Sequence, residues 1–299
     1  SKMKLNFSIR FFRYSAIILI IALIPLTVGC NAKSSPLDQI EFIPKNATTF
    51  SITSFEPEFD DLTRNKFGSN DPDSSYLRRV PDLYYEFTKP EQLDIHVIIS
   101  VYVPPKENNN EHIKNSYNSW IFTGMQNAPE YVKQKILEDW ESKSYRGYKI
   151  AQKGETSISA VNTSTLLITD GENILREFLL TAKGDLKNIQ STDLFKSVTN
   201  QIADDSFVLD YRLSCYEFQN IPGCQSESLG LSLNDEVTIK QTWVLSFESS
   251  DTASAVLEDI ETHIELKEHL FSKQVDQNRN LIISRSHIDT VDFDLNSIR

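Results

Sequence analysis

The chain has few of the residues from which catalytic and phosphate-binding loops are built. It contains nine glycines in 299 residues, and neither G-x-x-x-x-G-K-[ST] nor G-x-G-x-x-G occurs. The serine hydrolase elbow G-x-S-x-G is missing, and S-x-x-K is absent after residue 29. From these absences we expect a protein that is not an enzyme, with no catalytic residue and no cofactor.

Histidine is also scarce, and the five histidines lack the sequence spacing of a metal site. His263 and His269 are six residues apart on an expected helix, so they would lie on different faces, whereas H-x-x-x-H would share a metal. Asp71 and Asp73 stand in a turn-like run, where calcium binding is the alternative to a plain turn. We expect no metal site.

Carboxylates are absent before Asp38, and the start of the chain is basic. Its positive charges are Lys2, Lys4, Arg10 and Arg13. The apolar stretch that follows, residues 16–28, is about 13 residues long and too short to span a hydrocarbon core of ~30 Å. This order is typical of a secretory signal peptide, which we predict over residues 1–29. An uncleaved membrane anchor and cleavage at a neighbouring position are the alternatives.

The residues Leu26-Thr-Val-Gly-Cys30 resemble the lipobox of bacterial lipoproteins, with Thr27 where Leu is usual. In that family the cysteine thiol receives a diacylglyceryl group before cleavage, and the new amino terminus is usually acylated. The resemblance implies that Cys30 is the first, lipid-modified residue of the mature protein. The polar residues that follow, with Pro36 among them, predict a short tether, so that residues 30–39 comprise the lipidated cysteine and this tether. The resemblance also implies a membrane-anchored protein of the bacterial cell envelope that faces the periplasm or the exterior.

Positive charge is in the minority. Removing the four cations of the signal peptide takes the formal net charge from −12 to −16. Such a surface repels nucleic acid, which we do not expect as a partner. A solvated acidic surface is the simplest interpretation of this charge, and recruitment of basic partners or cations is the alternative.

Only three cysteines occur, and Cys30 is assigned to the lipid. Outside the cytoplasm the other two, Cys215 and Cys224, are expected to form a disulfide. The segment between them contains Pro222-Gly223, which favours a turn. Free thiols, or a metal site for which two cysteines are too few, are the alternatives.

Apolar residues recur with strand and helix periods through residues 40–299. The period of two is clearest from Leu93 to Val103, where every second residue is apolar. Strands are expected over residues 48–55, 93–103, 118–126, 145–152, 156–169, 207–213, 237–247 and 280–295. Helices are expected after Asn127, from Ile174 to Ala182, after Ser191 and from Ser250. This pattern predicts an α+β fold, mainly antiparallel sheet with helices packed on one face.

Two stretches follow a similar order. Trp120-Ile-Phe-Thr precedes a helix that contains Leu137-Glu-Asp, and Trp243-Val-Leu-Ser precedes a helix that contains Leu257-Glu-Asp. Strands follow in both cases. One interpretation is that the extracytoplasmic region, residues 40–299, consists of two similar halves, about 40–184 and 185–299; chance similarity is the alternative.

Three short motifs carry a second resemblance: Ile43-Pro-Lys-Asn-Ala-Thr, Tyr145-Arg-Gly-Tyr-Lys-Ile and Ser191-Thr-Asp-Leu-Phe. They are similar to an uncharacterised family of secreted or membrane-anchored bacterial proteins with repeated strand–helix units, which implies no catalytic residues. We expect a non-catalytic envelope lipoprotein that binds a protein partner or ligand. A carrier or chaperone with an apolar cavity, or a hydrolase with a site built from scattered residues, is the alternative.

Overall fold

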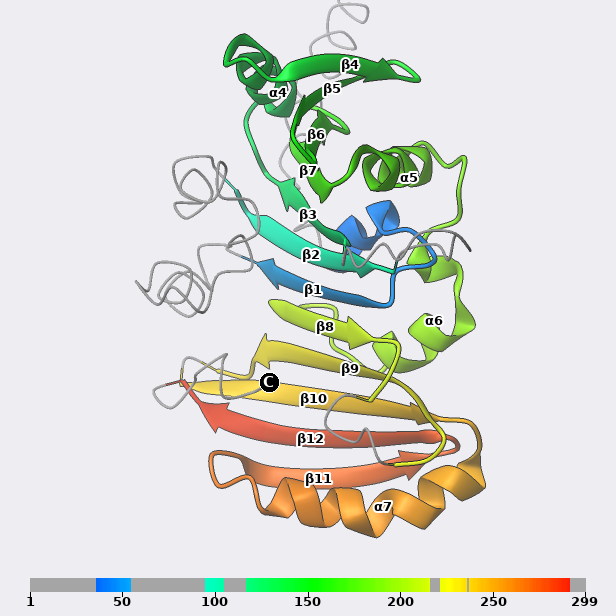
Figure 1. Ribbon diagram of the computed structural model, residues 1–299. Coiled ribbons are helices and arrows are strands. Elements are labelled where there is room, and N and C mark those ends of the chain that lie inside the picture. Colours follow the sequence, from blue (N-terminus) through cyan, green and yellow to red (C-terminus); the bar gives the residue numbers. More distant parts are fainter. Residues whose placement is uncertain (1–35, 55–94, 105–116, 216–220, 236, 291–299) are drawn as a thin grey trace, which may run out of the picture. The chain divides into compact units, whose positions relative to one another are not determined.

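A computed structural model describes residues 36–54, 95–104, 117–215, 221–235 and 237–290 of the chain. In this part, twelve strands form one sheet, in the order β11-β12-β10-β9-β8-β1-β2-β3-β7-β6-β5-β4 (Figure 1). Every neighbouring pair is antiparallel. The predicted α+β class with a mainly antiparallel sheet is therefore confirmed.

The sheet elements follow one another along the chain with short connections in most places. The strands are β1 Thr49–Ser54, β2 Val97–Val103, β3 Tyr117–Thr123, β4 Glu141–Tyr145, β5 Tyr148–Lys153, β6 Thr156–Ala160, β7 Thr165–Asp170, β8 Val208–Arg212, β9 Cys224–Leu233, β10 Thr238–Phe247, β11 Phe271–Asn278 and β12 Leu281–Asp289. The helices are η1 Pro36–Phe42, α4 Ala128–Leu137, α5 Glu172–Ala182, η5 Ile189–Ser191, α6 Asp193–Thr199 and α7 Ser250–Glu265.

The helices lie on both faces of the sheet, where the sequence predicted one face. On the face that carries Phe50 and Ile52, here called face A, η1, α5 and α6 pack in the largest apolar cluster. On the opposite face, face B, α4 packs over Trp120 and α7 over Trp243. The physical reason is that strands such as β7 are apolar at consecutive positions, so that they need cover on both sides.

The strand order reads the same outward from the central β8–β1 pair. One side runs β1, β2, β3, then β7 and β6, with α4 following β3. The other runs β8, β9, β10, then β12 and β11, with α7 following β10. β5 and β4 extend the first side alone. This arrangement agrees with the idea of two similar units, while the division at residues 184 and 185 stays a prediction.

Most predicted elements are present, with shifted ends. Asn127 caps α4 by accepting a hydrogen bond from the Glu130 N–H, as expected. Thr192, rather than Ser191, caps α6. The single strand expected over residues 145–152 is wrong, because Arg146 and Gly147, both with positive φ, form a turn between β4 and β5.

Several predictions fall on parts of the chain that the structure does not describe. These include the signal peptide, Cys30, Asp71, Asp73 and His112. Of the helices it does describe, none has the length and apolarity needed to cross a membrane. The disulfide predicted from the sequence is present, with the Cα atoms of Cys215 and Cys224 6.0 Å apart.

Candidate functional site

The centre of face B carries polar and charged side chains, and the described helices have their main contacts elsewhere. The main contacts of α4 are with β5, β6 and β7, and those of α7 are with β10, β11 and β12. The central strands β1 and β8 lie outside both sets of contacts. We call the side chains that β2, β1, β8 and β9 present here the polar strip: Ser100, Tyr102, Ser51, Asp210, Arg212 and Glu227.

The strip belongs to a register line that crosses the whole sheet on face B. Residues directly opposite one another in antiparallel strands point to the same face, so the pairings define this line. From one edge to the other it reads Ser142, Ala151, Ile158, Ile168, Trp120, Ser100, Ser51, Asp210, Leu229, Trp243, Ser284 and Val275. The two tryptophans each stand two strands outside the central Ser51–Asp210 pair.

Asp210 lies at the centre of the strip, and its carboxyl is poorly solvated. Burial raises the pKa of its carboxyl, and this effect is opposed by a hydrogen bond from the Ser51 hydroxyl and by the charge of Arg212. The residue as a whole is half-buried, but its Oδ1 atom is out of reach of solvent. A carboxylate in such a place gains more than an exposed one from a further positive charge brought close to it.

Arg212 and Glu227 face each other in the next register line, on β8 and β9. The Arg212 Nη1 and Glu227 Oε1 atoms are 3.6 Å apart, and the two side chains are 26% and 10% exposed. Glu227 is thus a buried carboxylate with a partly exposed partner. Together with Asp210, these residues place two carboxylates and one guanidinium close together among the described residues of the strip, an arrangement to which a cationic side chain can bind.

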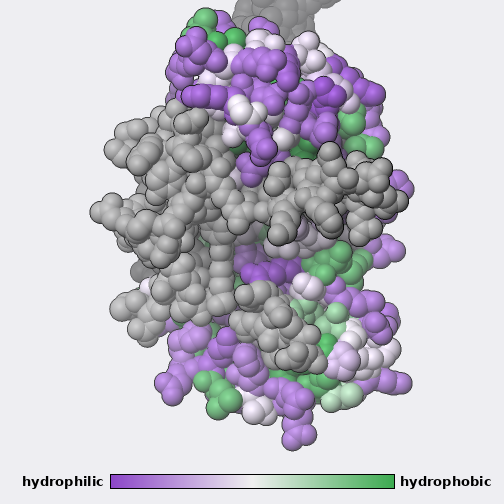
Figure 2. All heavy atoms as spheres, in the orientation of Figure 1, coloured by the Kyte–Doolittle hydropathy of each residue, from purple (hydrophilic) through white to green (hydrophobic). Residues whose placement is uncertain are grey.

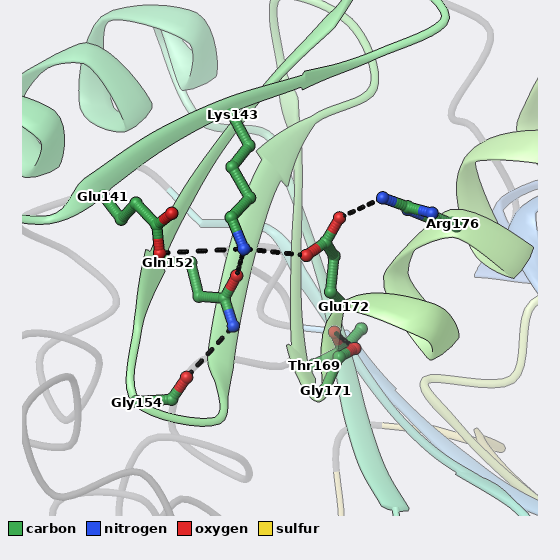
Figure 3. A network of polar contacts seen from close by, with 8 residues as sticks. All are labelled: Glu141, Lys143, Gln152, Gly154, Thr169, Gly171, Glu172 and Arg176. Atoms are coloured by element: carbon green, nitrogen blue, oxygen red, sulfur yellow. Dashed lines mark hydrogen bonds and ion pairs between the residues drawn. The ribbon is translucent and has the colours of Figure 1, made fainter.

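A second polar cluster joins the β4–β5 hairpin to the start of α5 (Figure 3). The Lys143 ammonium donates to Gln152 Oε1 at 2.7 Å and to Glu172 Oε2 at 3.1 Å, and Glu141 lies 3.6 Å away. Arg176 donates to the other oxygen of Glu172 and lies over the ring of Tyr145, 4.9 Å from its centroid. At the hairpin tip, Arg146 pairs with Asp185 at 2.5 Å.

The charges of this cluster are matched in a way that fastens the hairpin to α5. The hydrogen bond to Glu172 raises the pKa of Lys143, and the hydrogen bond from Lys143 lowers the pKa of Glu172. Both shifts move the pKa values of these groups further from neutral pH, whereas acid–base catalysis needs a pKa close to neutral. We therefore interpret the cluster as structural.

A groove of about 340 Å³ lies beside α6 on face A. Ile40, Phe195 and Ile202 form its apolar part, and polar groups such as Lys196 and Asn200 line the rest. The volume is near the lower end of the range for small-molecule sites, roughly 300–1,000 Å³. Its size and mixed lining give no support to a carrier of a large apolar ligand.

The residues that the sequence singled out are not brought together. His263 lies on α7 beside the Trp243 ring, with centroids 6.4 Å apart, while His269 follows the helix and His287 is on β12. Trp140 is part of the core under α4. Across the described ranges, no group of three or more His, Cys, Asp or Glu residues has the arrangement of a metal site.

Sequence reasoning missed the strip. Asp210 and Arg212 alternate with the apolar residues of the predicted strand 207–213, and such positions usually face solvent. The strand β9 was not predicted, because its three serines and one glycine hide the alternation of Leu229, Leu231 and Leu233. That alternation is the signal that could have placed Glu227 on the same face.

Much of the surface of the described residues is hydrophilic. Figure 2 shows one face of the molecule, where hydrophilic side chains predominate at the end that carries β4 and α4, and hydrophobic ones form small groups there and at the other end. Large exposed hydrophobic side chains are distributed over several elements, with Leu137 and Leu266 the most exposed at 75% each. Scattered residues of this kind need no functional explanation.

Comparison with known proteins identifies a fold and no family. No protein-family model matches the chain, and no curated protein matches it. One crystal form of the Treponema pallidum protein TP0453 is similar with a TM-score of 0.51 and 11% identity, covering 85% of this chain and 94% of that one. A second form gives 0.50 and 12%, covering 84% and 92%. At such identities the likeness concerns the fold alone.

Proposed function

We propose that this chain is an exported, lipid-anchored protein of a bacterial cell envelope that binds a basic segment of a partner protein on the polar strip. One observation carries the proposal. Two carboxylates and one guanidinium lie at low exposure on the central strands of face B, away from the main contacts of α4 and α7. A partner that brings a Lys or Arg side chain to Asp210 and Glu227 would form charge-assisted hydrogen bonds with carboxylates that are poorly solvated.

The charge of the whole chain supports the same choice of partner. The region after the signal peptide has a formal net charge of −16, which attracts a basic segment from a distance and raises its rate of association. The lipobox-like residues before Cys30 support export and anchoring. A non-catalytic role is part of this proposal.

Binding of a short oligolysine peptide to the purified chain tests the proposal. The variant Asp210→Asn/Glu227→Gln is expected to weaken binding by about tenfold or more, since the peptide loses the poorly solvated carboxylates. The control Glu258→Gln/Glu261→Gln removes two exposed charges from α7 and should change the affinity little. Equal losses in both variants would mean that net charge alone attracts the peptide, and would refute a site on the strip.

A further inference from the structure

The two edges of the sheet are protected to different degrees. At one edge, β11 has a register shift between Phe271 and Gln274, and Ser272 there has a φ of 50°. It is also in contact with α7. A bulge of this kind breaks the line of backbone groups that another strand could pair with. At the other edge, β4 pairs with β5 without any register shift over all five residues.

The turn between β4 and β5 determines which backbone groups of β4 are not paired with another described strand. Arg146 and Gly147 form a two-residue turn with φ of 49° and 94°, which makes Tyr145 and Tyr148 a hydrogen-bonded pair. Hydrogen-bonded and non-bonded pairs alternate along an antiparallel ladder. The N–H and C=O groups of Ser142 and Ser144 therefore point away from β5, and both side chains are exposed.

The side chains of β4 make this edge complementary to itself. Glu141 and Lys143 lie on face A, separated by one residue, and Glu141 is 65% exposed. A lone lysine on an edge would meet its own copy and repel it. The order Glu-x-Lys, by contrast, meets Lys-x-Glu when a second copy approaches antiparallel, so each charge faces its opposite.

We propose that two copies of this chain pair antiparallel through their β4 edges, with Ser142 opposite Ser142 of the second copy. In this register Glu141 of each copy faces Lys143 of the other, in two equivalent non-hydrogen-bonded pairs, where side chains come closest. The Ser142 pair exchanges two backbone hydrogen bonds, and Ser144 N–H reaches the Trp140 carbonyl of the second copy. The two sheets become one continuous sheet.

Other registers of the same edge are less favourable. Placing Ser142 opposite Ser144 brings Lys143 against Lys143, and like charges directly opposite destabilise a pair. Placing Ser144 opposite Ser144 moves Glu141 of each copy past the end of β4 in the other copy, next to the β4–β5 turn, where it no longer faces Lys143. The surface is separate from the polar strip, so the pairing does not depend on the proposed function. Because the interface is short, we expect it to form and dissociate readily.

Variants of the full chain that each carry one added cysteine on β4, studied in detergent, test the pairing and its register. In the proposed register the Cα atoms of residue 142 in the two copies are about 5.5 Å apart, within the span of a disulfide. Ser142→Cys is therefore expected to give a covalent dimer on mild oxidation. Ser144→Cys, equally exposed on the same strand, should not, because its two copies would be offset by about 14 Å along the strand.

Charge reversal supplies an independent measurement on the uncrosslinked protein. Sedimentation equilibrium should show reversible dimers, and Glu141→Lys should weaken them by about tenfold or more, since Lys then faces Lys143 twice. The control Glu155→Lys makes the same charge change in the β5–β6 turn and should leave dimerisation unaffected. A monomer at all concentrations with no dimer from Ser142→Cys would overturn the proposal. Crosslinking from Ser144→Cys instead would equally refute it.

Discussion

Ser51 and Asp210 face each other across the β1–β8 pair, at the position where the two similar arms of the sheet meet. On face B, the residues that follow Ser51 outward, one strand at a time, are Ser100 and then Trp120. On the other side, those that follow Asp210 are Leu229 and then Trp243. A serine and an aspartate thus hold equivalent positions. The difference places a carboxylate at the centre of one arm and a neutral hydroxyl at the centre of the other.

The replacement Asp210→Asn tests the electrostatics of the strip. Burial raises the pKa of Asp210, so the ionised form opposes folding at neutral pH. Below the ordinary pKa, 3.8, the carboxyl is protonated in both folded and unfolded chains and the penalty is absent. The variant should melt a few degrees above the wild type at pH 7.5, with the difference closing as the pH falls towards 4. Thermal melts at several pH values measure this, and a less stable variant at pH 7.5 would contradict it.

Glu172 joins the β4–β5 hairpin to α5, and its effect on stability should depend on pH in the opposite sense to that of Asp210. Its pKa is lowered by Lys143 and Arg176, so its ionised form stabilises the fold at neutral pH. That contribution is lost as the pH falls below the ordinary value of 4.5 and through the folded-state pKa. Glu172→Gln should cost about 1 kcal/mol of unfolding free energy at pH 7, and nothing at low pH. Urea titrations at both pH values measure this, with the exposed Glu155→Gln as control.

The packing of α6 on the sheet depends on the absence of a side chain at residue 230. A Cβ atom added to Gly230 on β9 would overlap the Cγ2 methyl of Ile202. Gly230→Ala should therefore destabilise the protein by ~1–3 kcal/mol. Ile202→Leu moves the branch away from Cβ, so the double variant should recover part of the loss. Additive losses in the double-mutant cycle would show that the two residues do not interact.

Lipid attachment at Cys30 is a separate prediction. Cells that express the chain and are fed labelled palmitate should give a labelled protein, because the lipobox-like residues 26–30 precede the cysteine. Cys30→Ala should remove the label and leave the precursor at its full length. Labelling that persists in the variant would show that another residue carries the lipid.

The sequence predicted the fold class and most of the strands, because half-buried strands alternate visibly between apolar and polar residues. It did not predict helices on both faces, although Leu166, Leu167 and Ile168 form a consecutive apolar run that requires cover on each side. The polar strip was out of reach for another reason. Asp210 and Glu227 are 17 positions apart in the sequence and are brought onto one face by a pairing that no local pattern specifies.

Crosslinking in living cells tests the proposed role of the polar strip most directly. A photo-reactive phenylalanine analogue at Tyr102, which lies half-buried on face B opposite Thr49, in the same register line as Arg212, would capture whatever binds there. We predict an adduct with a basic protein that is strongly reduced when Asp210→Asn/Glu227→Gln is added. The same analogue at Lys240, half-buried on face A, should not give that adduct. An adduct that is unchanged by the two substitutions, or that forms equally from residue 240, would contradict binding on the strip.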